Sequence, residues 1–318
     1  MVRGCAVLHT ELGGSAVSGP DAGDLSSALA KELRNFQEIA HWLMPEPGEV
    51  PRLAGIDVWG STRALGGAVG GDHLIYVDFK QRYDLQARIA EAEARGAATV
   101  VDGLRRCGHR AGIAVLDAAG HQMTDALLAA MIHQAFLLGA LYELDRYGQI
   151  TTRLFENLNT RLYRSSGAHK FVSLLYGEVS EEGTFRFLSA GQPLPRVFSP
   201  RLDRFIDIEA HRRVSAPPLG IQPSLHVIDR AAHESPFGFK DEYEVNEWAL
   251  LGSGDILLLY TDGVSEHADD RYCPDRLEDQ LRKVNHRSAR EICEAILADM
   301  LAFSAPVDDI TLVIVKRG

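Results

Sequence analysis

The sequence predicts an α+β protein in which helices and strands form separate layers. Strand patterns follow one another from about residue 171 to residue 260 with glycines at the turns, whereas helical patterns are grouped at about 83–106 and 124–163. A regular alternation of strand and helix would instead predict a parallel sheet with crossover helices. With 318 residues, 46% of them hydrophobic, the chain is long enough to bury a substantial core.

Composition and charge exclude several kinds of partner. The formal net charge of −11 argues against a surface that binds nucleic acid or anionic lipid electrostatically. The four cysteines are far apart and include no C-x-x-C pair, which is typical of a reducing cytoplasm. The N-terminal apolar stretch is too short for a signal peptide, and the most apolar run, about 126–142, is interrupted by His133 and Gln134. We interpret that run as a buried helix and expect a cytoplasmic protein without membrane contact.

The N-terminal region predicts two segments before the main domain. Residues 1–24 are rich in glycine, serine and alanine and predict a flexible leader. From Asp24, a suitable N-cap, apolar residues recur at three- and four-residue steps as far as Leu43, and Pro45 and Pro47 then end the helix. Residues 25–48 are therefore expected to form an amphipathic helix and linker, and residues 49–318 the domain.

The first half of that domain mixes strands and helices. The segments 56–60, 74–79 and 111–116 have the composition of strands, and the glycine-rich segment 66–72 lies between the first two. Residues 83–95 favour a helix that ends near Gly96, so a helix separates two of the strands. Two further helices are expected at about 124–147 and 150–163.

The second half is richer in strands. Glycines at 183, 191 and 254 mark turns between them. A helix at 289–303 precedes the last strand, 310–315. The other expected strands are 171–179, 184–190, 196–198, 204–208, 242–249 and 255–260.

Four aspartates lie next to predicted strands, a setting that suits a divalent metal site. Hard cations such as Mg²⁺ and Mn²⁺ prefer oxygen ligands, and a pair of them needs several carboxylates that converge from different strands. Taken singly, an aspartate at such a place is an ordinary turn residue, so spacing alone leaves both interpretations open. The four are Asp72, Asp117, Asp262 and Asp308.

Six short segments occur in a characteristic order between about residues 50 and 316. They are Gly70-Gly71-Asp72, Asp117-Ala118-Ala119-Gly120-His121, Ala190-Gly191-Gln192-Pro193-Leu194-Pro195, Pro217-Pro218-Leu219-Gly220-Ile221, Leu258-Leu259-Tyr260-Thr261-Asp262-Gly263-Val264-Ser265-Glu266 and Asp308-Asp309-Ile310-Thr311-Leu312-Val313. Together they resemble the SpoIIE-type branch of the PPM metal-dependent phosphatases. The resemblance implies a four-layer α-β-β-α sandwich of two antiparallel sheets flanked by helices, with a metal pair at one edge.

The resemblance also implies roles for particular residues. Two divalent cations, Mn²⁺ or Mg²⁺, would be held by the four aspartates and by the backbone carbonyl of Ala118. Water activated by both ions would attack phosphorus without a covalent phosphoenzyme. Of the adjacent pair, Asp308 rather than Asp309 is the expected ligand, because related enzymes often have a non-ligand at the second position, and a contribution from Asp309 or Asp78 stays open. His121 either protonates the leaving alkoxide as a general acid or caps the following helix, and both interpretations remain open.

The sequence departs from the family pattern in four places. The carboxylate that usually follows Gly-Gly-Asp closely is delayed to Asp78, Gln122 and Gln192 replace family residues, and a helical stretch at 80–106 replaces a short hairpin. These changes bear on rate and substrate fit more than on metal binding. They also support an alternative, a non-catalytic regulatory module that keeps the fold and binds a phosphoprotein or partner.

The resemblance implies a substrate class and two kinds of partner. SpoIIE-type phosphatases generally act on a phosphoserine or phosphothreonine of a STAS-domain anti-anti-sigma protein in a partner-switching pathway. A sensor domain usually precedes the phosphatase, whereas here about 50 residues do. The 25–43 helix could therefore self-associate, receive a separate sensor protein, or simply cover a sheet.

Overall fold

The structure is a computed structural model that describes residues 22–45, 49–66, 69–120, 123–166, 170–225, 235–249 and 251–318. The chain divides into two compact units, residues 1–39 and 40–318. Of the first unit, the structure describes the helix α1 (Ala22–His41), which continues into the second unit. It begins two residues before Asp24, the expected N-cap.

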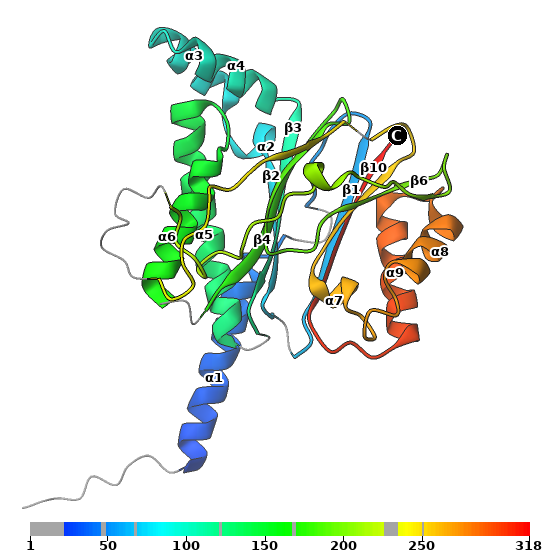
Figure 1. Ribbon diagram of the computed structural model, residues 1–318. Helices are drawn as coiled ribbons and strands as arrows, with labels where there is room; N and C mark the ends of the chain where they lie inside the picture. Colours follow the sequence, from blue (N-terminus) through cyan, green and yellow to red (C-terminus); the bar gives the residue numbers. More distant parts are fainter. Residues whose placement is uncertain are drawn as a thin grey trace, which may run out of the picture. The chain divides into compact units, whose positions relative to one another are not determined.

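In the described residues of the second unit, ten strands form two five-stranded antiparallel sheets (Figure 1). β1 and β2 are edge strands of different sheets. Sheet A has the order β1 (Ile56–Arg63), β10 (Ile310–Arg317), β9 (Ile256–Tyr260), β6 (Arg196–Ser199) and β7 (Arg204–Phe205). Sheet B has the order β2 (Asp72–Asp78), β3 (Arg110–Ala118), β4 (Val172–Ser180), β5 (Phe185–Ala190) and β8 (Asn246–Trp248).

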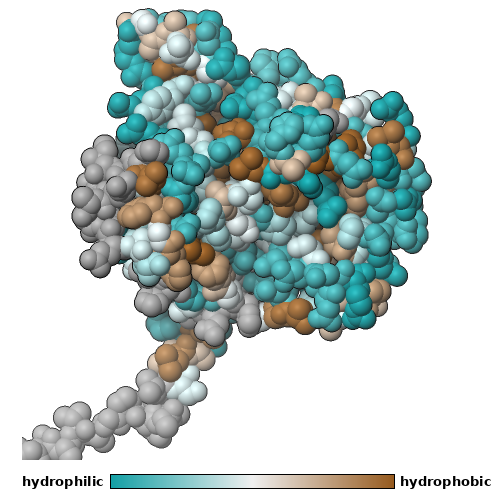
Figure 2. Space-filling view, in the orientation of Figure 1, coloured by the Kyte–Doolittle hydropathy of each residue, from teal (hydrophilic) through white to brown (hydrophobic). Residues whose placement is uncertain are grey.

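Helices cover the outer face of each sheet (Figure 1). Leu281 of α8 and Ile292 of α9 pack on sheet A, and Figure 2 shows a mainly hydrophilic surface over these two helices. Phe136 of α5 and Leu158 of α6 pack on sheet B. The helices are α2 (Phe79–Arg82), α3 (Leu85–Ala94), α4 (Ala98–Cys107), α5 (Met123–Tyr147), α6 (Thr152–Ser166), α7 (Asp262–Ser265), α8 (Asp275–Val284) and α9 (Ala289–Phe303), with a short 3₁₀ turn at Ala210–Arg212.

Alternate side chains of each central strand enter two different core layers. In β10, Val313 and Val315 lie between the sheets, whereas Leu312 and Ile314 face α8 and α9. Because successive side chains of a strand point to opposite faces, a strand that is apolar on both faces must be covered on both. The resulting layers are helix, sheet, sheet and helix, which confirms the expected α-β-β-α sandwich.

Several elements differ from their expected bounds. The helical stretch at 80–106 contains most of the short helix α2 and two longer helices, α3 and α4, and Gly96, with a positive φ of 68°, separates the two longer ones. The strand expected at 242–249 is shorter, because residues 246–248 alone pair with β5. In the segment expected as a strand at 204–208, Arg204 and Phe205 form β7, and the Ile206 N–H adds one hydrogen bond to the Val197 carbonyl of β6. The α8 helix was not anticipated, although its spacing of Leu277, Leu281 and Val284 is helical.

The long helix α5 is buried on one face only. Ala129, Phe136, Ala140 and Leu144 pack on sheet B, as expected for a core helix. The opposite face is exposed, which corrects the expectation that the whole run is buried. Residues Thr124–Tyr147 are long and apolar enough to cross a membrane by length and composition, a property that a core helix shares. The exposed residues are Leu127, Met131, Leu138 and Tyr142.

Candidate metal centre

Sheet B brings the first two aspartates together. Asp72 is the first residue of β2, and the antiparallel register places it directly opposite Asp117 of β3. Directly opposed residues project from the same face of a sheet. Strand alternation with Leu74 and Val115, which lie between the sheets, directs both carboxylates towards sheet A. Two carboxylates so placed repel each other unless a proton or cation lies between them.

Sheet A supplies the other two aspartates at the same end of the sandwich. Asp262 begins α7 directly after β9, and Asp308 precedes β10, which pairs with β9 in antiparallel register. A direct bond joins the sheets here, since the Thr261 hydroxyl donates to Asp72 Oδ2 at 2.8 Å. The Thr311 backbone N–H in turn donates to the Thr261 hydroxyl at 3.0 Å. Sequence reasoning missed Thr261, although it precedes Asp262 directly.

The pKa values show that these carboxylates act on one another. Burial raises the pKa of Asp117 to about 7, and the negative charges of Asp262 and Asp308 add to that rise. Burial and then the charge of Asp308 raise the pKa of Asp262. Burial and then Asp117 hold the pKa of Asp72 well above its ordinary value. A cation among them would relieve the repulsion that these shifts record.

Asp309 has a different role from Asp308. Its Oδ1 accepts from the Leu65 N–H at 2.6 Å, and its Oδ2 accepts from the Gly71 N–H at 2.7 Å. The carboxylate is buried and holds the segment that leads into Asp72. Gly70 permits this approach, because a Cβ there would lie 2.0 Å from Asp309 Oδ2. Both oxygens of Asp309 are thus used by backbone donors.

Asp78 lies away from the four aspartates. It pairs with Ala111, at the opposite end of β2 from Asp72. Its carboxylate caps α2, accepting from the Lys80 N–H at 3.1 Å, and also accepts from the Arg52 N–H at 2.9 Å. The carboxylate of Asp78, which comes later in this sequence than in the family pattern, is therefore a helix cap.

The Ala118 carbonyl belongs to the segment that ends β3. The Ala118 N–H donates to the Gly71 carbonyl at 3.1 Å, so this segment lies beside the one that leads into Asp72. After it, Lys170 Nζ lies 3.4 Å from the Ala119 carbonyl and forms an ion pair with the buried Asp125. Sequence reasoning missed this pair. His121 and Gln122 lie outside the described residues.

The four carboxylates are suitable ligands for hard divalent cations, although their side chains do not converge into a closed binding set. All four side chains offer carboxylate oxygens, the ligands that Mg²⁺ and Mn²⁺ prefer. In the part of the chain that the structure describes, no three histidine, cysteine, aspartate or glutamate side chains are arranged closely enough to hold a metal ion. The charges of Asp262 and Asp308 nonetheless contribute to the raised pKa of Asp117, so the carboxylates of the two sheets lie within electrostatic reach of one another.

Solved structures share this architecture. The PP2C domain of SiaA from Pseudomonas aeruginosa matches with a TM-score of 0.61 and 16% identity, over 94% of this chain and 100% of that one. The RsbU and RsbW domains of a Mycobacterium tuberculosis protein match with a TM-score of 0.58 and 19% identity, over 84% of this chain and 61% of that one. The phosphatase domain of SpoIIE from Bacillus subtilis, with a fragment of its regulatory domain, matches with a TM-score of 0.56 and 16% identity, over 83% of this chain and 64% of that one. This chain thus spans less than two thirds of the length of the last two proteins.

The two-sheet sandwich of this chain is the fold of the PP2C class of protein serine/threonine phosphatases. The family model described as stage II sporulation protein E (SpoIIE) matches residues 108–318, and the chain belongs to that family. The comparison with curated protein sequences gives no match.

Proposed function

We propose that this chain is a metal-dependent phosphatase of protein phosphoserine or phosphothreonine. The observation that carries the proposal is the approach of carboxylates from two sheets. Asp72 lies opposite Asp117, whose pKa is raised to about 7 by burial and then by the charges of Asp262 and Asp308. Family membership supplies the reaction class. The four carboxylates and the Ala118 carbonyl would hold two divalent cations, Mn²⁺ or Mg²⁺.

The chain's own residues prepare this edge for catalysis. When bound, the cations supply an activated water and neutralise charge on the phosphoryl oxygens. The Thr261 hydroxyl orients Asp72 across the gap between the sheets, and Asp309 fixes the backbone that carries Asp72. The Asp125–Lys170 pair holds the segment after Ala118. His121 is the candidate donor of a proton to the leaving serine oxygen.

The first test is the cation dependence of hydrolysis. We expect the purified chain to hydrolyse a phosphoserine peptide and an aryl phosphate with Mn²⁺ or Mg²⁺, to stop when a chelator is added, and to recover when Mn²⁺ is restored. The Asp78→Asn variant is the matched control, since its carboxylate caps α2 at the far end of β2. Turnover that persists in chelator would contradict the proposal.

One observation favours a second candidate, the non-catalytic module. The described residues contain no closed set of three metal-binding side chains, and Gln192, which replaces a family residue, is buried with its Oε1 lacking a hydrogen-bond partner among the described residues. Such a module would bind a phosphopeptide but would hydrolyse neither the phosphoserine peptide nor the aryl phosphate. The cation experiment separates the two candidates, because only the enzyme releases phosphate.

For the substrate we propose a phosphorylated STAS-domain regulator in a partner-switching pathway. The supports are the family and the solved neighbour described as RsbU and RsbW domains. The cytoplasm is the proposed location, since such regulators and free buried cysteines belong to a reducing compartment.

We further propose that α1 is a contact for self-association or for a separate sensor protein. Its apolar residues Leu29, Leu33 and Ile39 recur on one helical face. Removal of residues 1–48 is expected to change either the oligomeric state, measured by light scattering, or the phosphatase activity, measured in the absence of a sensor protein. Leu33→Glu should reproduce the change, and Arg34→Glu, on another face, should not. A truncated chain equal to the full chain in both measurements would refute the role.

A further inference from the structure

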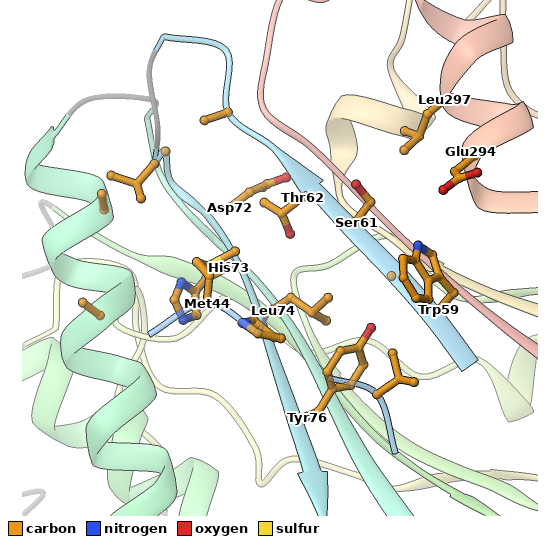
Figure 3. A pocket seen from close by; sticks show the side chains of 18 of the residues that line it. Met44, Trp59, Ser61, Thr62, Asp72, His73, Leu74, Tyr76, Glu294 and Leu297 are labelled. Atoms are coloured by element: carbon orange, nitrogen blue, oxygen red, sulfur yellow. The ribbon is translucent and has the colours of Figure 1, made fainter. Parts of the chain in front are cut away.

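Two cavities of about 380 Å³ lie at different places in the second unit. One belongs to the metal edge, since Asp72 and Thr62 line it (Figure 3). The other, the α4 cavity, lies where α4 packs against the junction of α5 and α6. Arg106 of α4 and Arg146 of α5 are both in its wall. Its volume is within the range of small-molecule sites, about 300–1,000 Å³.

The α4 cavity is far from the four aspartates. Figure 1 shows α4 at the end of the sandwich away from α7, which begins with Asp262. The strand β3 runs from Arg110, close after α4, past Asp117. The segment from 110 to 117 spans roughly 23 Å, at about 3.3 Å per residue. A ligand in the α4 cavity would therefore not contact the metal centre.

The two arginines in its wall have no carboxylate partner among the described residues. Arg106 forms no ion pair there, and Arg146 Nε donates instead to the Tyr147 hydroxyl at 3.0 Å. The neighbouring arginine of α4 is paired, since Arg105 Nη2 lies 2.8 Å from Glu93 Oε1. The sequence has 44 acidic and 33 basic residues, so carboxylates are in excess. Two arginines left without one in a single wall therefore form a local cationic site.

Neutral donors and one acceptor complete the polar wall. The Thr99 hydroxyl and the Gln149 amide line the cavity, and neither side chain makes a hydrogen bond within the described chain. The Thr151 hydroxyl already donates to a buried glutamate. The carboxylate in the wall is Asp102, whose Oδ1 lies 4.0 Å from Arg105 Nη1. Four side chains thus offer donors, and one offers an acceptor.

Close backbone contact fixes the two arginines relative to each other. A Cβ at Gly103 of α4 would lie 2.6 Å from the carbonyl oxygen of Gly148, which follows α5. Gly148 has a positive φ of 68°, and a Cβ there would lie 2.2 Å from the Val100 carbonyl oxygen. Glycine at both positions lets α4 lie directly on the end of α5. The backbones that carry Arg106 and Arg146 are therefore in place before a ligand binds, which lowers the cost of binding.

The charges select a phosphomonoester that carries hydroxyl groups. Guanidinium groups bind phosphate and carboxylate oxygens through paired N–H bonds. A phosphomonoester is nearly a dianion at neutral pH and has three terminal oxygens, which suits two arginines and two neutral donors better than a carboxylate does. Inorganic phosphate alone would leave most of the cavity empty. Asp102 repels a second anionic group and can accept from a hydroxyl.

We propose that the α4 cavity binds a small, hydroxylated phosphomonoester, with its phosphoryl oxygens on Arg106 and Arg146 and a hydroxyl that donates to Asp102. The helix α4 belongs to the stretch 80–106, where this sequence departs from the family pattern, so the site is a feature that this chain adds. It does not depend on the proposed phosphatase function, because binding is measured without a divalent cation.

The probe is glucose 6-phosphate, a molecule of about 16 non-hydrogen atoms, for which a Kd of about 0.1–3 mM is expected. Binding is followed by saturation transfer from protein to ligand protons in ¹H NMR. The full chain is used after divalent cations and chelator have been dialysed away, a state in which the aspartates repel an anion. The ionic strength is kept at about 50 mM, since salt screens exposed arginines.

Three comparison ligands test the chemistry of recognition. Glucose, which has no phosphoryl group, should not bind measurably. Glucuronate, which has a carboxylate instead, should bind roughly 10-fold more weakly than glucose 6-phosphate. Ethyl phosphate, which has no hydroxyl group, should bind about 3- to 10-fold more weakly.

Variants place the probe in the α4 cavity. Arg106→Gln and Arg146→Gln should each raise the Kd by about 3- to 30-fold, through loss of charge-assisted hydrogen bonds. Arg105→Gln is the matched control, because it removes the same charge from the same helix, but Arg105 pairs with Glu93 and does not line the cavity. It should leave the Kd unchanged. Asp102→Ala should remove the preference for glucose 6-phosphate over ethyl phosphate.

Asp262→Asn separates this site from the metal centre. The variant should bind glucose 6-phosphate with an unchanged Kd, whereas a probe at the aspartates would bind more tightly once one negative charge is removed. Three results would overturn the proposal: no saturable binding of glucose 6-phosphate, equal binding of glucose, or a loss in Arg105→Gln as large as that in Arg106→Gln. Misfolding does not explain a loss, because Arg105 and Arg106 are both exposed and their variants should keep the Tm.

Discussion

Asp262→Asn is expected to abolish cation-dependent hydrolysis while leaving the fold intact. Asparagine keeps the size of the side chain at the start of α7 but removes the charge that a hard cation needs. Asp308→Asn should act alike, since the charges of both carboxylates contribute to the raised pKa of Asp117. Loss of several kcal/mol of charge stabilisation predicts a fall in kcat/KM of about 10²–10⁴-fold. Calorimetric Mn²⁺ titration should show weakened binding in both variants.

Two further aspartates provide the controls for this experiment. Asp78→Asn should retain metal binding, because its carboxylate caps α2 at the other end of β2. Asp309→Asn should weaken metal binding less than Asp262→Asn, but should lower stability by about 1–3 kcal/mol, since an amide cannot accept from both the Leu65 and Gly71 N–H groups. Unchanged Mn²⁺ binding in both Asp262→Asn and Asp308→Asn would refute the two-metal site and favour the non-catalytic module.

The strands that carry the four aspartates were predictable from the sequence, and their meeting was not. Runs such as Leu257-Leu258-Leu259 are apolar on both faces and therefore indicate buried strands. The pairing of Asp72 with Asp117 depends on strand register, and the bond from Thr261 to Asp72 joins residues that are 189 positions apart. Only the family resemblance placed these residues at one edge.

The errors have local physical causes. The apolar run of α5 predicted burial, yet a helix against one sheet buries a single face, which leaves Met131 exposed. The segment 242–249 has strand-forming residues, but a strand also requires a partner, and β5 pairs with three of them.

The stability of the cation-free protein should depend on Asp117 in a way that divalent cations reverse. The pKa of Asp117, raised by burial and then by Asp262 and Asp308 from 3.8 to about 7, means that the folded state keeps a proton that the unfolded state has already released. Stability is therefore lost as the pH rises towards 7. Between about pH 5 and pH 8 the loss is of the order of 3 kcal/mol, at 1.36 kcal/mol per pKa unit.

Two histidines change the stability with pH in the opposite direction. The contribution of Asp117 must therefore be measured as a difference in stability between two chains. Burial lowers the pKa of His73 to about 3 and that of His133 to about 4, so the unfolded state binds more protons and stability rises with pH up to about 6.5. Comparison with Asp117→Asn cancels this contribution, because the variant keeps both histidines.

In chelator, Asp117→Asn should be similar to the natural chain in free energy of unfolding near pH 5, where Asp117 is mostly protonated in the folded state. It should exceed the natural chain by an increasing margin towards pH 8, because the neutral amide does not repel Asp262 and Asp308. With saturating Mg²⁺ the order should reverse, since a cation that binds the folded state stabilises it by mass action and the variant has lost a ligand. Urea unfolding across this pH range measures both effects. A difference that does not grow with pH, or an order that Mg²⁺ leaves unchanged, would show that Asp117 does not face the other carboxylates across a metal site.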